Sequence, residues 1–208
     1  KAVYEDERTV AAYRTLRNNE IDRRCVDLGV AYALTGDEKY ARPVRDVLLK
    51  LALLYPTWKH HDRWDHPRLL AVVGGWRYCQ LLDEATSIIT LSSAYDLVAA
   101  APCFSDADRK KTEDELLEYV ANQVRTYQKF IEPENNHQTW FNDAYAAVGL
   151  AAGDADLLTA AIRGEGRGLV WQLENSVTDD GLWYEGANAY HFYALMAIQQ
   201  TLDCAKRA

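Results

Sequence analysis

Three neutral hydrogen-bonding side chains stand side by side at Asn135, Asn136 and His137, directly before a helical pattern. Asn favours the N-cap position, where its side-chain oxygen accepts one of the backbone N–H groups left without a partner in the first helical turn. Capping explains one asparagine. It does not explain the second amide or the imidazole, so Asn136 and His137 are candidates for chemistry at this helix entrance.

A second candidate cluster lies further along the chain, where Tyr190, His191 and Tyr193 open a predicted helix behind a glycine-containing turn. Tyr190 and Tyr193 are three positions apart and therefore share a helix face, while His191 points elsewhere. Such tyrosines can pack in the core with their hydroxyl groups reaching water. They can equally aim a phenol into a cleft, and the residues alone leave both interpretations open.

Carboxylates in the same region suggest a different reaction. A glycosidase uses two carboxyl groups on either side of a sugar bond, one as an acid and the other as a base or nucleophile. Asp179, Asp180 and Glu185 flank a glycine, and Glu185 could be paired with Asp179 or with Asp143. Asp-Asp-Gly is also ordinary turn chemistry, and Glu185 could instead buttress the helix that follows.

A polar and aromatic loop near residue 60 contains side chains of the types that bind metal ions. Imidazole and carboxylate ligands suit zinc or manganese. Their spacing fixes no geometry, however, and the loop could equally be solvated surface or the wall of a ligand site. The sequence therefore assigns no metal ligand and leaves a structural divalent ion open. The residues concerned are His60, His61, Asp62, Asp65 and His66.

The composition is that of a globular protein able to bury a sizeable core, since 49% of the 208 residues are hydrophobic and 26% are charged. The net charge of −8 offers no basic footprint for nucleic acid or for a membrane surface. Six tryptophans and thirteen tyrosines suit both core packing and stacking on the apolar faces of sugar rings. We expect neither nucleic acid nor a membrane as a partner.

Helical periodicity dominates the chain, and strand patterns are nearly absent. Gly36 and Gly153 each end an alanine-rich helix, and Asp37 and Asp154 each cap the next one. This repeated unit predicts one all-α domain over residues 1–208, an incomplete (α/α) toroid of antiparallel helical hairpins. The predicted helices are 5–17, 19–35, 38–55, 68–80, 83–101, 106–130, 137–152, 155–176 and 187–206.

The predicted architecture brings the two candidate clusters together. In a ring of hairpins, alternate helices have their equivalent ends on the same side. One predicted helix separates the helix that begins near His137 from the helix that begins near Tyr190. We therefore expect Asn136, His137 and Tyr190 to meet over one mouth of the ring.

Four segments carry a family resemblance: NNHQTWFNDAYAAVGLAAGD, DDGLWYEGANAYHFYAL, GWRYCQLLDEATSIITLSSAYDLV and TGDEKYARPVRDVLLKLALLYPTW. They resemble the helical domain of the heparinase II/III-like polysaccharide lyases, a superfamily that includes alginate, oligoalginate and heparin or heparan lyases. Its members carry an incomplete (α/α) toroid followed by a large β-sandwich region. The resemblance, from about residue 20 onward, implies that this chain is a toroid fragment whose C-terminal β-region is missing.

The resemblance also implies a reaction, β-elimination at a uronic acid of an acidic polysaccharide. A base removes the proton at C5, next to the carboxylate, and an acid protonates the departing oxygen at C4. Hydrogen-bond donors on the carboxylate offset the developing charge as an oxyanion hole does, by roughly 3–4 kcal/mol per donor. Asn136 and His137 would be these donors, with His137 also a candidate base and Tyr190 the catalytic acid or base. This chemistry needs no cofactor.

Further residues match positions that line the substrate groove in relatives. Arg77 could bind a carboxylate through two hydrogen bonds, Gln80 could bond a sugar, and Trp76 could stack on one. The structural alternatives are a core position for Trp76 and pairing of Arg77 with Asp83 or Glu84. The predicted substrate-binding residues are Gln80, Arg77, Trp76, Tyr184, Glu185, Tyr193 and His191, with His60, His61 and Arg68 as weaker candidates.

Two other functions stay open. A glycoside hydrolase on a similar toroid would use Glu185 with Asp143 or Asp179, and its product would carry no double bond. A non-catalytic domain would bind an acidic glycan without turnover. For the lyase, the resemblance implies a periplasmic or secreted location.

Overall fold

The computed structural model describes residues 6–64, 66, 71 and 73–208, and this part of the chain is predominantly helical. Two isolated bridges, His61 with Gly75 and Val177 with Trp183, are its only β-pairing. The predicted all-α fold is therefore confirmed. In chain order the elements are α1 (Glu7–Thr35), α2 (Glu38–Leu54), the 3₁₀ turn η2 (Tyr55–Thr57), α3 (Leu81–Val98), α4 (Asp106–Thr112), the π-helical η4 (Glu113–Leu117), α5 (Glu118–Tyr127), the 3₁₀ turn η5 (Gln128–Phe130), α6 (Asn136–Ala152), α7 (Ala155–Arg163), α8 (Leu169–Asn175) and α9 (Asn188–Arg207).

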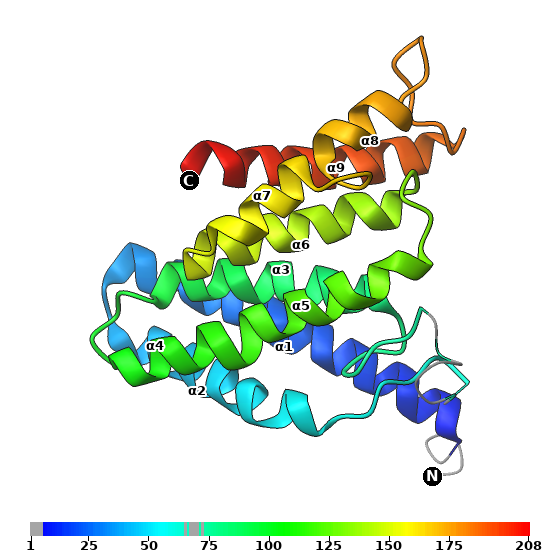
Figure 1. The fold of residues 1–208 in the computed structure, drawn as a ribbon. Helices are drawn as coiled ribbons and strands as arrows, with labels where there is room; N and C mark the ends of the chain where they lie inside the picture. Colours follow the sequence, from blue (N-terminus) through cyan, green and yellow to red (C-terminus); the bar gives the residue numbers. More distant parts are fainter. Residues whose placement is uncertain (1–5, 65, 67–70, 72) are drawn as a thin grey trace.

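The helices form hairpins in two layers (Figure 1). In one layer α1, α3, α6 and α9 lie next to one another in this order and run in the same direction. In the other layer α2, α4–α5 and α7–α8 return in the opposite direction. The N-termini of α3, α6 and α9 consequently lie at one end of the molecule, on the right of Figure 1. This is the arrangement predicted for an incomplete (α/α) toroid.

The predicted hairpin turns are confirmed at both glycines. Gly36 follows α1 with φ of 68° and donates its N–H to the Tyr32 carbonyl oxygen, and Gly153 follows α6 with φ of 73°. Glycine adopts such positive φ values without a steric penalty. Asp37 and Asp154 then cap α2 and α7 by accepting backbone N–H groups of the first helical turn.

Two predicted helix boundaries are wrong. The helices expected at 5–17 and 19–35 are one helix, α1, because Asn18 and Asn19 lower helix propensity only modestly and no proline or glycine interrupts the chain there. The helix expected at 155–176 is divided into α7 and α8. The chain turns between Gly164 and Gly168, where Gly166 has φ of 68°.

The helix predicted at 68–80 is absent from the described part of that range, residues 71 and 73–80. Oε1 of Glu84 accepts the backbone N–H groups of Trp76, Arg77 and Tyr78 at distances of 2.6, 2.7 and 2.8 Å. These donors are therefore not available for helical hydrogen bonds. A Cβ atom at Gly75 would lie 2.6 Å from the same oxygen, so the loop can approach Glu84 this closely because residue 75 is glycine.

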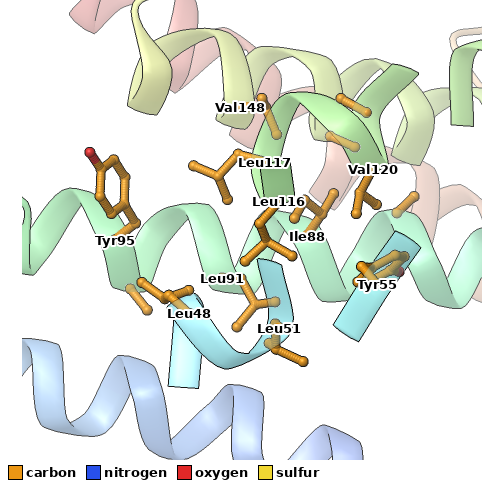
Figure 2. Close-up of a cluster of buried hydrophobic side chains, with 14 of the residues drawn as sticks. Leu48, Leu51, Tyr55, Ile88, Leu91, Tyr95, Leu116, Leu117, Val120 and Val148 are labelled. Atoms are coloured by element: carbon orange, nitrogen blue, oxygen red, sulfur yellow. The ribbon is translucent and has the colours of Figure 1, made fainter. Parts of the chain in front are cut away.

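An apolar core joins the two layers (Figure 2). Its side chains are contributed by α2, η2, α3, η4, α5 and α6, and each buried aliphatic or aromatic side chain contributes roughly 1.5–3 kcal/mol. Packing of α2 and α5 against α3 and α6 therefore fixes the positions of α3 and α6, two of the helices whose N-termini lie at the same end. No helix in the described ranges is long and apolar enough to cross a bilayer. The labelled residues are Leu48, Leu51, Tyr55, Ile88, Leu91, Tyr95, Leu116, Leu117, Val120 and Val148.

Candidate active site at the N-terminus of α6

The capping role predicted for Asn135 is confirmed. Asn135 has extended backbone angles, and its side-chain oxygen accepts the backbone N–H of His137 at 2.9 Å. Asn136 is the first helical residue of α6 and is 4% exposed, while His137 follows it and is partly exposed. The second amide and the imidazole are therefore free of the capping role and stand on the first turn of a long helix.

Glu185, in the loop before α9, is bonded to Asn136. The backbone N–H of Asn136 donates to Oε2 of Glu185 at 2.9 Å, and Nδ2 of Asn136 lies 2.9 Å from each carboxylate oxygen. The indole N–H of Trp183 donates to the same Oε2 at 2.6 Å. Asn136 and Trp183 thus donate hydrogen bonds to the carboxylate of Glu185, which the sequence analysis placed among the substrate-binding residues. A direct contact of Glu185 with a substrate stays a prediction.

His137 has the electrostatic surroundings of a neutral imidazole. Burial lowers the pKa of His137 below its ordinary value, and the Glu185 carboxylate opposes that change. A lowered pKa leaves the ring uncharged near pH 7, with one nitrogen to donate a hydrogen bond and the other to accept a proton. His137 is therefore suited to act as a donor or as a base.

The N-terminus of α9 lies at the same end as the N-terminus of α6 (Figure 1), and the two helices are in contact. Tyr193 packs on Trp140 of α6 with ring centroids 4.7 Å apart, and burial, assisted by Asp83, raises the pKa of Tyr193. Tyr190 stands one turn earlier on α9 and is 49% exposed. The phenol of Tyr190 is therefore the accessible one, at the end of the molecule that carries His137.

Both helices also supply positive potential at this end. The backbone N–H groups of a first helical turn point away from the helix, and the helix dipole favours an anion there. The N-cap residue of α9, Ala187, has no side chain that could accept a first-turn N–H. In the first turn of α6, by contrast, backbone N–H groups donate to Asn135 and Glu185. An anionic ligand at this end would meet the uncapped N–H groups of α9.

A network of buried amides fixes the segment that leads into α6. Gln138, Asn142 and Gln172 are 0–1% exposed. Asn142 donates to Gln172 at 2.9 Å, Gln138 donates to Asn142 at 3.1 Å, and Gln172 donates to the carbonyl oxygen of Pro133 at 3.0 Å. Arg167 joins the network through Gln138 at 3.0 Å. Sequence reasoning missed these residues, although polar side chains inside a helix that is otherwise apolar were a usable signal.

Two predicted substrate-binding residues are buried instead. The side chain of Arg77 is 2% exposed and donates to Asp22 at 2.7 Å, not to either acid considered from the sequence. Trp76 is 8% exposed and packs against the His60 and Tyr127 rings, with centroids 4.6 and 5.3 Å away. In this arrangement Arg77 cannot bind a substrate carboxylate and Trp76 cannot stack on a sugar, so we assign both residues structural roles.

The remaining predicted binding residues border the same end of the molecule. Gln80 is the N-cap residue of α3 and is partly exposed. Tyr184 is 44% exposed, and burial and the Glu185 carboxylate raise its pKa. Nδ1 of His191 accepts a hydrogen bond from the backbone N–H of Trp183, with the two nitrogens 3.1 Å apart. Their contact with a substrate stays a prediction.

Of the aspartates considered for a hydrolase, Asp143 is inaccessible and Asp179 lies in an exposed turn. Asp143 is 0% exposed on α6, and neither of its oxygens has a hydrogen-bond partner among the described residues. Burial raises the pKa of Asp143 to about 8. Asp180 accepts the hydroxyl of Thr178 at 2.6 Å in the turn around Gly181, next to the exposed Asp179. These aspartates therefore have the roles of a buried neutral acid and of ordinary turn residues.

The histidine-rich loop is held by local contacts. His61 bonds the Lys59 carbonyl oxygen at 3.0 Å, and Asp62 lies 2.9 Å from Nδ1 of His66. The ring of His60 packs between Trp76 and Tyr127. Across the described ranges, no three potential metal-ligating side chains gather in one place. Asp65 and Arg68 lie outside the described residues.

The sequence profile of the alginate lyase family matches residues 5–207. The chain belongs to the alginate lyase family. One relative, the alginate lyase of Stenotrophomonas maltophilia, is 29% identical over 171 residues, which are 80% of this chain and 22% of that protein. Another, the exo-oligoalginate lyase of Saccharophagus degradans, is 27% identical over 202 residues, 93% of this chain and 25% of that protein. This family member thus spans about a quarter of the length of these relatives.

Solved structures share the fold of this alginate lyase family member. Alginate lyase A1-III of Sphingomonas species A1 superimposes with a TM-score of 0.70 at 20% identity, over 91% of this chain and 50% of that one. A tyrosine-to-phenylalanine variant and a histidine-to-alanine variant of alginate lyase A1-III, each complexed with a tetrasaccharide, match with the same TM-score at 19% identity. These structures confirm the predicted toroid fold, and the match to the family profile confirms the predicted lyase superfamily.

Proposed function

We propose that this chain carries the catalytic groups of a polysaccharide lyase that cleaves alginate, a polymer of uronic acids, by β-elimination. Membership of the alginate lyase family supports the substrate class and the type of reaction. The observation that carries the proposal is the position of Asn136 and His137 on the first turn of α6, at the end of the molecule where α9 also begins. Tyr190 is in the first turn of α9.

The chemistry follows from these three side chains. The uronate carboxylate lies at the helix N-termini and accepts hydrogen bonds from Asn136 and His137, which stabilise the charge that develops when the C5 proton leaves. Tyr190, whose side chain is accessible, exchanges the proton with the substrate. A phenol can donate a proton near pH 7 and act as a base where positive potential surrounds it.

The base and the acid can also be assigned to two different residues. The neutral imidazole of His137 is a second candidate for removal of the C5 proton, because its pKa is lowered by burial. In that case Tyr190 protonates the departing C4 oxygen. Both assignments require the two helix N-termini to face one sugar, and neither requires a metal ion or an organic cofactor.

An ultraviolet absorbance assay tests the proposal, because β-elimination leaves a double bond conjugated with the carboxylate. The assay uses this chain, and any longer protein that contains it, with alginate and other uronate polymers. We expect an absorbance increase on alginate that falls about 100-fold or more for His137→Ala and for Tyr190→Phe. Tyr13→Phe, at an exposed tyrosine on α1, is the matched control and should keep full activity.

The same assay separates the other two functions. New reducing ends without an absorbance increase would indicate hydrolysis and refute elimination. Binding of alginate by every protein tested, without either product and without a change for Tyr190→Phe, would indicate a non-catalytic glycan-binding domain. The periplasmic or secreted location implied by the family stays a prediction, which fractionation of the producing cells would test.

A further inference from the structure

The loop that carries Glu185 is anchored in a small core of its own. Trp183 is 4% exposed and packs with Leu169 of α8 and with Ala194 and Ile198 of α9. Its backbone N–H donates to Nδ1 of His191 on α9 at 3.1 Å. Since the indole N–H donates to Glu185, the carboxylate is held in place by the packing of α8 and α9.

A glycine turn directs the same carboxylate toward α6. Gly186 has φ of 73° and donates its N–H to the Trp183 carbonyl oxygen at 3.3 Å. The chain therefore folds back at Glu185 before α9 begins. One carboxylate in this way joins the helix of Tyr190 to the first residue of the helix of His137.

We propose that Glu185 is a positioning residue for the Asn136–His137 pair, a role that rests on the proposed lyase function. The carboxylate holds the Asn136 amide in one orientation, because the rotated amide would turn its oxygen toward a negative charge. An amide nitrogen carries two hydrogens. Nδ2 lies 2.9 Å from both oxygens of this one carboxylate, contacts that a single N–H shared between the two oxygens can make. The other N–H is then left to bind the uronate.

The charge of Glu185 is compatible with an anionic substrate nearby. Three N–H groups donate to this carboxylate, two from Asn136 and one from Trp183, and it lies at the positive end of α6, which offsets a negative charge. The carboxylate also favours a protonated His137, against the effect of burial. Other ionisable residues on the adjoining segments are Lys129, Glu132, Glu134, Tyr184, Tyr190 and His191.

Substitutions of Glu185 test the proposal with two separate readouts. Glu185→Gln keeps the size of the side chain, but it removes the charge and turns one acceptor into a donor that faces the donors of Asn136 and Trp183. We expect kcat to fall roughly 10- to 100-fold with a much smaller change in KM, as for a catalytic group that is misplaced by about 1 Å. Glu185→Asp keeps the charge and should recover part of the lost kcat.

The second readout is the NMR titration of the His137 imidazole, which needs no substrate. Loss of the Glu185 charge should move this titration to lower pH, together with the limb of the pH–activity profile that His137 controls. The separate side-chain amide signals of Asn136 should lose their protection from exchange with water. Asp180→Asn, which removes a carboxylate from the same loop, is the matched control and should change none of these quantities.

Each adverse outcome has a distinct meaning. Wild-type kcat together with an unmoved His137 titration in Glu185→Gln would overturn the positioning role. An increase in KM at unchanged kcat would also overturn it, since that result identifies a substrate-binding residue. If the longer protein that contains this chain is inactive on every uronate polymer while the titration still moves, the lyase function is refuted and the contact of Glu185 with the pair still stands. If Glu185→Gln does not fold, Glu185→Asp decides by the same criteria.

Discussion

Replacement of Asp143 by asparagine should change how the stability of the protein depends on pH. The carboxyl group is fully buried on α6 without a hydrogen-bond partner among the described residues, and burial raises its pKa from 3.8 to about 8. A carboxyl group with a raised pKa stabilises the folded state fully below its unfolded-state pKa, near 4. This stability is lost as the pH rises to about 8.

The magnitude follows from the linkage between proton binding and folding. Between the two pKa values the folded state binds one proton more than the unfolded state, so the free energy of unfolding falls by about 1.4 kcal/mol per pH unit through this group. Between pH 5 and pH 7 the loss is about 2.7 kcal/mol. The variant Asp143→Asn would show no such dependence at this position, because an amide does not titrate.

Urea unfolding at pH 5, 6 and 7 measures the effect directly. The stability of Asp143→Asn relative to the wild type should rise by about 1.4 kcal/mol for each pH unit, whatever constant difference the buried amide introduces. Asp179→Asn, at an exposed turn position, is the matched control. If the free energies of unfolding of the wild type and of Asp143→Asn change with pH by the same amount, the reasoning is refuted. The same variant should keep lyase activity, since a buried neutral acid has no access to a substrate.

Two further substitutions test the roles assigned to buried or strained positions. Arg77→Met should lower the free energy of unfolding, measured in urea, by about 3–5 kcal/mol, because it leaves the Asp22 carboxylate buried without its cationic partner. An unchanged free energy of unfolding together with a raised KM would restore the substrate-binding role of Arg77. Gly186→Ala should lower the unfolding free energy by about 1–2 kcal/mol, since φ is 73° there, and should lower kcat through Glu185. Wild-type kcat in Gly186→Ala would contradict the proposed coupling of this turn to the site.

Sequence patterns predicted the fold well where a local signal was sufficient. Glycine followed by aspartate marked two hairpin turns, and both are present at Gly36 and Gly153. The pattern failed at residues 71 and 73–80, where the Glu84 carboxylate takes the backbone N–H groups that a helix would use. A buried acid that organises a loop leaves no periodic signal, so the predicted helix could not be rejected from the sequence.

The order of helices predicted that α6 and α9 begin at one end of the molecule, and they do. That Asn136, His137 and Tyr190 act together on one sugar stays a prediction. The partners of Arg77 and Glu185 could not be predicted, because Asp22 and Asn136 are distant in sequence and meet these residues only through helix packing. Local spacing favours nearby acids for Arg77, whereas the fold brings it to an acid on α1.

The most direct test of the central claim is to follow the hydrogen at C5 of the uronate. In this experiment the active protein is incubated with alginate deuterated at C5, and the masses of the products are measured by mass spectrometry. Elimination predicts that each new unsaturated end has lost the C5 deuterium and gained no water, and that the reaction is slower than with ordinary alginate. New ends that retain the deuterium and have gained the mass of water would contradict β-elimination and the roles proposed for Asn136, His137 and Tyr190.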